Sequence, residues 1–372
     1  MKVVLAFDKF KGSATAQELN EAAQVGLCGL DHVTTACVPI ADGGDGTTAV
    51  LASTRPGQWV TLSAPAPLLQ LNPVNASYYC CDDGTAIIEV AAASGLALIP
   101  EDARDVMRAT TLGTGLMMRD AMERGCRHIV LGLGGSATCD AGMGIMSAMG
   151  AEFLDHDGHY LYPSGASLER ITRIETRGIP REVLDSHFTL LTDVDIPLCG
   201  QAGAATVFAP QKGATPQQVI DLDNGLRHLA AIIGNDISTQ RGCGAAGGIP
   251  ALMMHLLPHC ELLPGAPFVL DSGGLDQALD GADLVITGEG RLDRQTLMGK
   301  APGLVIGRAR KRGIPVVAVC GAIDDDFDTS AAGLQAAIAV SKALPPLVAM
   351  DNAGTLARVT EAVRQLVQPF LT

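Results

Sequence analysis

The feature that most constrains the fold is an alternation of short apolar runs with helical patterns at both ends of the chain. The apolar runs lie at 2–7, 33–40, 283–287, 314–321 and 336–341. Helical patterns follow the first and third of these runs, over 16–27 and from about 302 to 311. Strands that alternate with helices are typical of a parallel sheet with helices on both faces. We therefore predict an α/β protein.

The middle of the chain has a different pattern. Residues 58–99 alternate apolar and polar side chains, which indicates antiparallel strands. We predict a discontinuous Rossmann-like or flavodoxin-like parallel-sheet domain built from 1–62 and 268–372, with a second, inserted α/β domain over 63–267. Two sequential domains divided near residue 150 are the alternative. At 372 residues the chain is long enough for either arrangement.

Charge and cysteine usage limit the partners and the compartment. The chain has 26 Lys+Arg against 40 Asp+Glu, a formal net charge of −14. This balance disfavours nucleic acid and anionic membranes as partners, because both favour basic patches. The ten cysteines form no CxxC pair, and the start MKVVLAFD has no pattern of a signal peptide. The apolar span 129–151 is interrupted by Asp140. We expect a cytoplasmic protein with free thiols.

Three kinds of polar feature follow the predicted strands. The first is the glycine turn GLGGSA (132–137), which fits G-x-G-x-x-[GA] and precedes a predicted helix. It favours anion binding by Gly134, Gly135, Ser136 and Ala137. A dinucleotide turn, with Asp155 or Asp157 as the ribose-binding acid, and a turn that serves packing alone are the alternatives. GCGAAG (242–247) fits the same pattern, so the pattern is weak, and the chain has no Walker P-loop.

The second feature is a set of carboxylates placed directly after strands. Its members are Asp8, Asp42, Asp45, Asp193 and Asp195. Ligands of open α/β sheets bind beyond the carboxyl ends of the strands, where carboxylates suit Mg²⁺ or take a hydroxyl proton. Helix capping is the structural alternative for each single aspartate.

The third feature is cationic. Its members are Lys9, Lys11, Lys212, Arg291, Arg294 and Lys300. Arginine and lysine bind carboxylates and phosphates. Arg291 and Lys300 stand in TGEGRLDRQTLMGKAP (287–302), which also carries Glu289 and Asp293. Carboxylates, cations and glycine turns at strand ends are what phosphoryl transfer requires, so the residues favour a kinase without a P-loop.

The histidines and serines favour no other chemistry. His255 and His259 are four residues apart beside Cys260, but Pro258 interrupts their helix and disfavours a zinc site. No G-x-S-x-G motif is present, which disfavours a hydrolase.

Six motifs occur in the order that is typical of one family. They are AFDKFKGS (6–13), VPIADGGDGT (38–47), EVAAASGLALIP (89–100), LGLGGSATCDAGMG (131–144), FAPQKGA (208–214) and LVITGEGRLDRQTLMGKAP (284–302). Over residues 1 to about 345 the chain resembles the bacterial glycerate kinase type-1 family. The resemblance implies a two-domain α/β kinase with its active site in the cleft between the domains. The implied reaction is ATP-dependent phosphorylation of D-glycerate, at the 2-hydroxyl, to give 2-phosphoglycerate and ADP. Phosphorylation at the 3-hydroxyl, or of a related hydroxy acid, is the alternative.

Some positions depart from the family pattern. TDVDIPL (192–198) has Thr192 in place of Cys and Ile196 in place of Asn, while Asp193 is kept. The departure at Ile196 removes any role of an amide there. Asp45 stands where many relatives have Glu, so a carboxylate remains with a shorter reach.

The resemblance, together with the strand-end pattern, gives each candidate a role. We assign catalysis to Asp193, as acceptor of the hydroxyl proton, and to Lys11, Arg291 and Lys300. We assign substrate binding to Asp8, Asp42, Asp45 and Asp293. We assign nucleotide binding to Gly134, Gly135, Ser136, Ala137, Lys212 and Glu289. The expected cofactors are ATP and Mg²⁺, with the metal at Asp42 and Asp45. The expected assembly is a monomer or homodimer that binds neither nucleic acid nor membrane.

Two functions of other classes compete with the kinase. An NAD-dependent oxidoreductase would use the 132–137 turn and would leave Arg291, Lys300 and the aspartates unexplained. A binding protein for a small hydroxy acid would keep its function when Asp193 is replaced by Asn. A requirement for both ATP and Mg²⁺ would separate the kinase from both.

Overall fold

The computed structural model describes residues 1–342 and 344–371, and within them the chain forms two compact units. We call them unit 1 (Met1–Asp42, Ala49–Thr54 and Gly265–Thr372) and unit 2 (Gly43–Thr48 and Arg55–Pro264). The N-terminal and C-terminal segments belong to the same unit. The predicted α/β class is confirmed, because each unit contains a sheet with parallel strands and packed helices.

The sheet of unit 1 is parallel throughout. In the described chain its five strands have the order β15-β13-β11-β1-β2. They are β1 (Lys2–Phe7), β2 (Thr34–Cys37), β11 (Leu284–Gly288), β13 (Val316–Cys320) and β15 (Ala336–Ala339). Counted along unit 1 alone, this is the 2-1-3-4-5 order of flavodoxin-like folds, in which ligands bind where the order reverses, here between β1 and β11.

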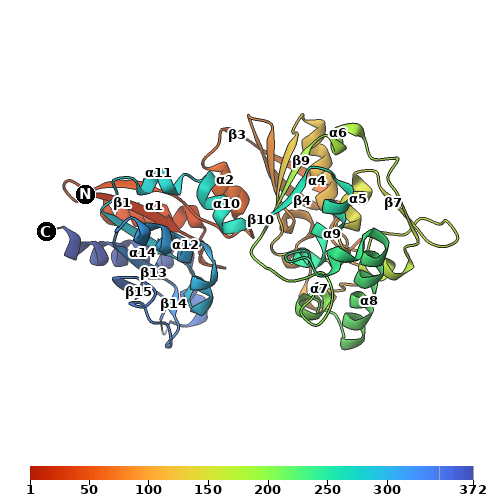
Figure 1. The fold of residues 1–372 in the computed structure, drawn as a ribbon. Helices are drawn as coiled ribbons and strands as arrows, with labels where there is room; N and C mark the ends of the chain where they lie inside the picture. The colour runs from red at the N-terminus through yellow and green to blue at the C-terminus, as the bar shows by residue number, and fades with distance from the viewer. Residues whose placement is uncertain (343, 372) are drawn as a thin grey trace. The chain divides into compact units, whose positions relative to one another are not determined.

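Helices cover both faces of this sheet, and Figure 1 shows α1 and α14, which cover one of them, beside β1 and β13. Alternate strand residues supply two separate cores, Val3, Leu5 and Phe7 facing one way and Val4 and Ala6 the other. The first core is completed by α1 (Ala16–Leu27) and α14 (Asn352–Val367), the second by α10 (Gly265–Ser272), α11 (Leu275–Leu279) and α12 (Ala301–Lys311). Parallel strands buried on both faces explain the continuous apolar runs in the sequence.

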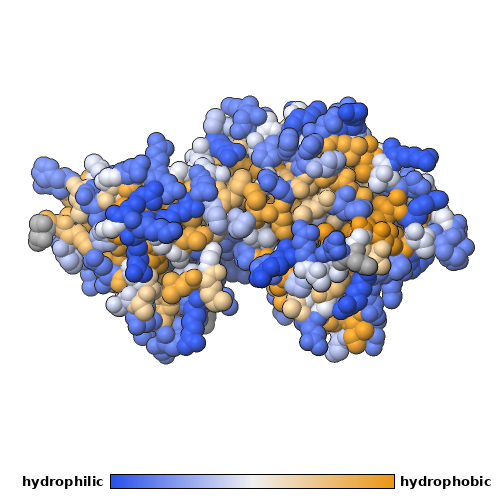
Figure 2. All heavy atoms as spheres, viewed as in Figure 1, coloured by the Kyte–Doolittle hydropathy of each residue, from blue (hydrophilic) through white to orange (hydrophobic). Residues whose placement is uncertain are grey.

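A charged surface covers part of unit 1. Figure 2 shows hydrophilic side chains over the region of α11 and α12. There Arg308 pairs with Asp271 and Asp276, and Arg312 pairs with Asp276 and Asp280. The carboxylate partners of these two arginines lie in α10 and at α11, and none of them is a candidate site residue.

The sheet of unit 2 is mixed, with the order β10-β9-β6-β5-β4-β3 in the described chain. Its strands are β3 (Gly57–Ala64), β4 (Val74–Cys81), β5 (Thr85–Glu89), β6 (His128–Gly132), β9 (His187–Thr192) and β10 (Cys260–Pro264). The β3–β4 and β4–β5 pairs are antiparallel, which confirms the antiparallel prediction for this stretch. The β5–β6, β6–β9 and β9–β10 pairs are parallel. A domain boundary after residue 62 would divide β3, whose whole length pairs with β4.

The helices of unit 2 pack on a large apolar core that includes Tyr78, Met117, Leu131 and Phe188. They are α3 (Ala91–Ser94), α4 (Leu112–Glu123), α5 (Met143–Ala148), α6 (Arg181–Leu184), α7 (Ala204–Phe208), α8 (Pro216–Ile233) and α9 (Ile249–Leu256). Thr215 and Gln218 form a capping box that fixes the start of α8, as Thr15 and Glu18 do for α1.

Shorter elements complete the chain. α2 (Thr47–Ala52) and α13 (Pro346–Ala349) are short helices, β7 (Glu152–Leu154) pairs with β8 (Arg173–Glu175), and β12 (Arg291–Leu292) pairs with β14 (Ala322–Ile323). The 3₁₀ helices are η1 (Leu96–Leu98), η2 (Glu101–Ala103), η3 (Gly165–Arg170), η4 (Pro210–Lys212), η5 (Asn235–Ser238), η6 (Ala245–Gly247), η7 (Arg294–Met298) and η8 (Gln368–Phe370). Within the described ranges, no helix combines the length and apolar character needed to cross a membrane. The predicted domain limits and the predicted cleft stay predictions.

Candidate active site

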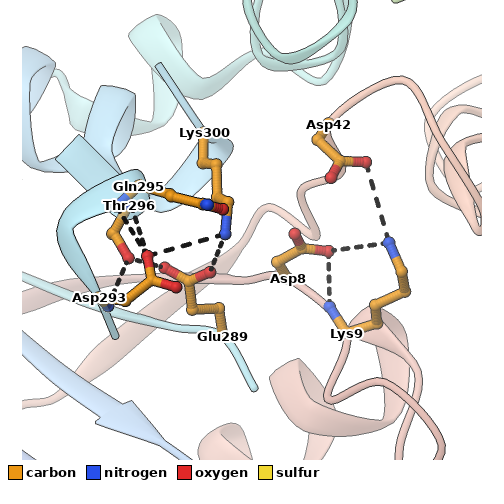
Figure 3. Close-up of polar contacts among 8 residues, drawn as sticks. All are labelled: Asp8, Lys9, Asp42, Glu289, Asp293, Gln295, Thr296 and Lys300. Carbon is orange, nitrogen blue, oxygen red and sulfur yellow. Dashed lines mark hydrogen bonds and ion pairs between the residues drawn. The ribbon is translucent and has the colours of Figure 1, made fainter. Parts of the chain in front are cut away.

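The carboxyl ends of β1 and β11 bring two acidic side chains to the reversal point of the unit 1 sheet. Phe7 pairs with Gly288, and the Asp8 N–H donates to the Gly288 carbonyl at 2.9 Å. Asp8 and Glu289 are therefore the first residues beyond two neighbouring parallel strands. This is the position at which open α/β sheets bind ligands. Figure 3 shows these two carboxylates with Asp42 and Lys300.

Asp8 is a buried carboxylate with a lysine partner. The Lys9 ammonium lies 3.8 Å from Asp8 Oδ1 and 3.9 Å from Asp42 Oδ1 (Figure 3). The Lys9 N–H also donates to Asp8 Oδ1 at 2.7 Å. Burial raises the pKa of Asp8 to about 6, an effect that Lys9 opposes and the charge of Asp42 strengthens. Asp8 therefore titrates much closer to neutrality than an exposed aspartate.

Glu289 is buried to a similar degree and has two partners. The Thr296 hydroxyl donates to Glu289 Oε1 at 2.6 Å, and the Lys300 ammonium lies 4.0 Å from Glu289 Oε2 (Figure 3). Burial raises the pKa of Glu289 to about 7, although the Thr296 hydrogen bond and Lys300 both oppose the shift. At neutral pH the two protonation states of this carboxyl are close in free energy.

Asp293 has both a capping and an electrostatic contact. It is the N-cap of η7, and its Oδ1 accepts from the N–H groups of Gln295 and Thr296 at 2.8 and 3.1 Å. The same oxygen lies 3.9 Å from the Lys300 ammonium. Lys300 thus stands near two carboxylates without a short ion pair to either. Thr296 completes the arrangement, since its Oγ1 also accepts from the Asp293 N–H at 3.1 Å.

The other candidate cations of unit 1 are Lys11, Arg291 and Arg294. Arg291 is exposed and its Nη1 lies 2.7 Å from Asp324 Oδ1, while Arg294 pairs with Asp326 at 2.9 Å. Lys11 is exposed, and it has no ion pair among the residues that the structure describes. The structure places Lys300 near Glu289 and Asp293, whereas Arg291 contacts Asp324, a residue that the sequence did not single out.

Unit 2 has its own set of residues at the carboxyl ends of neighbouring strands. Glu89 ends β5, and its carboxylate accepts the N–H groups of Gly46 and Thr48 at 3.2 and 2.7 Å. Burial raises the pKa of Glu89 above its usual value. Glu89 thus anchors the loop that carries the exposed Asp45. Sequence reasoning missed Glu89, although an acidic residue that ends an apolar strand was a usable signal.

The glycine turn follows β6, the next strand of this sheet. In the described structure the consecutive N–H groups of Gly134, Gly135 and Ser136 have no hydrogen-bond partner, whereas Ala137 N–H donates to the Ser94 carbonyl at 2.9 Å. Gly135 has φ +72°, and a Cβ on Gly134 would lie 2.5 Å from Gly44 Cα. Successive free N–H groups around a left-handed residue form an anion-binding nest. The geometry supports anion binding by three of the four predicted residues.

One predicted feature of this turn is wrong. The turn does not open a helix, because α5 begins only at Met143. The N–H groups of Gly142 and Gly144 at the start of α5 donate to the buried Asp140 carboxylate, which also accepts from Thr111. The N-terminus of α5 is therefore neutralised internally, and only the turn itself is available to an anion. A dinucleotide turn also needs an adjoining helix, so this finding disfavours the oxidoreductase.

Lys212 supports the turn from inside the protein. Its ammonium is buried and donates to Ser136 Oγ at 2.9 Å and to the Thr138 carbonyl at 2.7 Å. Burial lowers the pKa of Lys212 to about 8. In this conformation Lys212 holds the turn in place instead of presenting its charge at the surface.

Asp193 lies beyond β9, whose residue Leu191 pairs with Gly132 of β6. It is exposed at the same edge of the sheet as the glycine turn. Asp195, two residues on, pairs with Arg241. The three strand ends β5, β6 and β9 therefore present Glu89, the nest and Asp193 in this order across one edge.

Two of the candidate carboxylates are of the kind that binds Mg²⁺. Asp42 and Asp45 offer hard carboxylate oxygens of the kind Mg²⁺ prefers, and Mg²⁺ is usually held by one or two carboxylates together with substrate phosphates. Within residues 1–342 and 344–371, three side chains whose ligand atoms already lie together occur only at Asp155, Asp157 and His159. Asp42 and Asp45 therefore fit an ion that is bound together with nucleotide phosphates, and they do not supply a complete set of protein ligands for it.

Together the parallel sheets, the buried carboxylates beside lysines and the glycine nest define an α/β phosphotransferase without a P-loop. The chain belongs to the glycerate kinase family, whose model, described as "Glycerate kinase family", matches residues 3–368. The family predicted from the six motifs is confirmed.

Individual relatives agree with this assignment. A glycerate kinase of Haemophilus influenzae is 40% identical over 337 residues, which cover 88% of each chain. The glycerate 2-kinase of Escherichia coli K12 is 39% identical over 336 residues, covering 88% of this chain and 87% of the relative. Among solved structures, a crystal structure from Salmonella typhimurium LT2 assigned as a glycerate kinase 2 has a TM-score of 0.86 at 36% identity, covering 100% of this chain and 98% of the other.

Proposed function

We propose that this chain is an ATP-dependent kinase that phosphorylates D-glycerate at its 2-hydroxyl and releases 2-phosphoglycerate and ADP. The observation that carries the proposal is the acidic cluster at the β1–β11 reversal point. There two carboxylates with raised pKa values stand beside the Lys9 and Lys300 ammonium groups. Family membership and the glycerate 2-kinase of Escherichia coli support the substrate and the position.

In unit 1, Lys300 is the group we assign to the anionic oxygens of substrate or transferring phosphoryl. Its ammonium lies 4.0 and 3.9 Å from Glu289 and Asp293, so both carboxylates orient it without holding it in a short ion pair. A cation positioned in advance costs little reorganisation when negative charge develops. Lys11 and Arg291 are the further cations of the proposal, and Asp8 and Asp42 fix Lys9.

In unit 2, the nest of Gly134, Gly135 and Ser136 is assigned to nucleotide phosphate, with Lys212 as the positioning residue that holds Ser136 and Thr138. Asp193 is assigned as the acceptor of the 2-hydroxyl proton, because it is an exposed carboxylate at the same sheet edge. Mg²⁺, held by Asp42 or Asp45 with the phosphates, would supply charge neutralisation on the transferring group. We expect a monomer or homodimer.

A coupled assay of ADP release tests the proposal. We expect ADP only when ATP, Mg²⁺ and D-glycerate are all present, and no turnover of NAD⁺ with D-glycerate. L-glycerate is the matched control, because it offers the same groups in the other configuration. Release of ADP that does not depend on any hydroxy acid, in protein shown to be folded, would contradict the proposal.

Asp193→Asn separates the kinase from a mere binding protein. The exchange keeps size and removes the proton acceptor, so kcat should fall by about 10²-fold or more while glycerate binding persists. Asp195→Asn is the control, because Asp195 is an exposed carboxylate two residues away to which no role in the reaction is assigned. An unchanged kcat in Asp193→Asn would remove Asp193 from the catalytic groups.

A further inference from the structure

A histidine stands at or directly before the start of each of three neighbouring parallel strands of unit 2. His128 and His187 are the first residues of β6 and β9, and they are paired in register. His259 directly precedes β10, and because Phe188 pairs with Cys260, His259 lies beside His187. Side chains at one level of in-register parallel strands point to the same face, about 4.8 Å apart. The three imidazoles therefore form a row across the sheet.

A second polar row lies two residues further along the same face. Thr189 pairs with Glu261, and its hydroxyl donates to Glu261 Oε1 at 3.2 Å. His128 Nε2 lies 3.0 Å from the same hydroxyl oxygen. A hydroxyl that donates to Glu261 accepts from the His128 ring, so Thr189 connects the imidazole of His128 to the carboxylate of Glu261.

Both rows line one cavity. Its volume is about 510 Å³, and it is lined by the three histidines, Thr189, Glu261 and Cys260 with Phe188 and Pro258. His187, His259 and Glu261 are exposed, so a solute can reach their ring nitrogens and carboxylate oxygens. The cavity is large enough for a hydrated ion and opens at the amino ends of β6, β9 and β10.

The spacing of the rings suits a shared ion. The ring centroids of His187 and His259 are 5.0 Å apart and the planes are inclined by 33°. Two imidazole nitrogens at about 2.0–2.1 Å from one tetrahedral ion place their ring centroids about 5 Å apart. The strands thus already hold the two imidazole rings at the separation that a shared ion requires. Only rotation about the side-chain bonds is needed to turn their nitrogens toward the ion.

We propose that this cavity binds a divalent transition-metal ion of the Zn²⁺ class through His187, His259 and Glu261, with Thr189 and His128 holding the carboxylate from behind. Two imidazoles with one carboxylate are a ligand set that Zn²⁺ accepts, and it leaves a position for water. An anion is disfavoured, because Glu261 stands in the cavity and the chain has a formal net charge of −14.

This site is distinct from the candidate active site of unit 2. Glu89, the glycine nest and Asp193 follow the carboxyl ends of β5, β6 and β9, whereas the histidine row lies at the amino ends of β6, β9 and β10. Strands of five or six residues span about 17–20 Å. An ion in the cavity therefore does not contact the reacting groups of the kinase proposal, and it acts on the stability of unit 2.

Calorimetric titration of the full chain with Zn²⁺, after treatment with a chelator, tests the proposal. We expect one saturable equivalent, a rise in Tm with Zn²⁺, and affinity at least about tenfold lower in each of His187→Ala, His259→Ala and Glu261→Gln. Thr189→Val should weaken binding about tenfold, the usual cost of losing an outer partner. His255→Ala, an exposed histidine outside the cavity, is the control that should bind normally.

Asp155, Asp157 and His159 are the competing ligand group. His159→Ala should leave the affinity unchanged, and loss of binding in this variant but not in the His187→Ala/His259→Ala double variant would overturn the proposal. Absence of saturable binding in the folded wild-type chain would overturn it as well. Co²⁺ provides a second readout that does not depend on variant stability. The wild-type protein should show the intense visible absorption of a tetrahedral site, and a weak octahedral spectrum would contradict the ligand set.

Discussion

Lys300 is the residue whose environment is most specific to the proposed chemistry. Its ammonium is oriented by Glu289 and Asp293 at 4.0 and 3.9 Å, and its side chain is only partly exposed. Lys300→Met should lower kcat/KM for D-glycerate by about 10²–10³-fold, because it removes a pre-positioned cation.

The control is Lys311→Met at the end of α12, an exposed lysine in the same unit that should change kcat/KM less than about twofold. Steady-state kinetics at saturating ATP measures both variants. Equal activity in the Lys300 and Lys311 variants would contradict the role of Lys300.

Asp8 predicts a specific pH dependence of stability. Its pKa is raised by burial from 3.8 to about 6, so the folded state binds the proton more tightly than the unfolded state. The resulting stabilisation is fully present below about pH 4 and is lost as pH rises through about 6. Asp8→Asn should therefore gain free energy of unfolding relative to wild type between pH 4 and 7, by up to about 3 kcal/mol.

Urea unfolding at several pH values measures this difference, with the exposed Asp31→Asn as control. A difference between Asp8→Asn and wild type that stays constant from pH 4 to 7 would show that Asp8 is not a buried, shifted carboxyl.

The sequence predicted the identity of several site residues better than their contacts. Asp8, Glu289 and Lys300 were recognised because they follow apolar strands beside glycines. The partner of Arg291 is Asp324, 33 residues later, and no local sequence pattern predicts an ion pair over this distance in the chain. Thr296 was missed, because its contact with the Glu289 carboxylate exists only after the loop folds, whereas Glu89 was missed although it ends an apolar strand.

At the scale of elements, the glycine turn after β6 is the most sensitive to substitution. A Cβ on Gly134 would lie 2.5 Å from Gly44 Cα, and no side-chain rotation can relieve this contact, because the backbone fixes the positions of both atoms. Gly134→Ala should lower the free energy of unfolding by about 1–3 kcal/mol and raise KM for ATP more than KM for glycerate.

Gly307→Ala is the matched control, because Gly307 lies in α12 with no atom within 4 Å of its ideal Cβ. It should stabilise the protein by about 0.5–1 kcal/mol and leave both KM values unchanged. Thermal unfolding and kinetics compare the two. A harmless Gly134→Ala would rule out the close approach of the two loops.

Elements with local start signals were predicted closely, and α5 was not. α1 and α8 begin directly after Thr15 and Thr215, each with a capping box. The helix that we predicted after the glycine turn spans only Met143–Ala148 in the structure. Asp140 fixes its start through hydrogen bonds to Gly142, Gly144 and the distant Thr111, which is tertiary information that a periodicity does not contain.

In the whole molecule, the main feature that the sequence patterns predicted is that one parallel sheet is built from both ends of the chain. Its strands β2 and β11 are separated in the sequence by the segment that forms unit 2. The inner strands β1 and β11 are 281 residues apart at their Thr287–Ala6 hydrogen bond, yet they are neighbours in one parallel sheet. The alternating pattern at both ends predicted this discontinuous sheet. The predicted limits of the insertion, 63–267, stay a prediction, and a boundary after residue 62 would divide β3.

Transfer of phosphate from ATP to the 2-hydroxyl of D-glycerate can be observed by ³¹P NMR of the reaction mixture. We predict a new phosphomonoester that appears with ADP and is split into a doublet by one proton, since C2 carries a single hydrogen. A triplet from two equivalent couplings would place the phosphate on the 3-hydroxyl. No phosphomonoester from folded protein that binds ATP would contradict the glycerate kinase account of this chain.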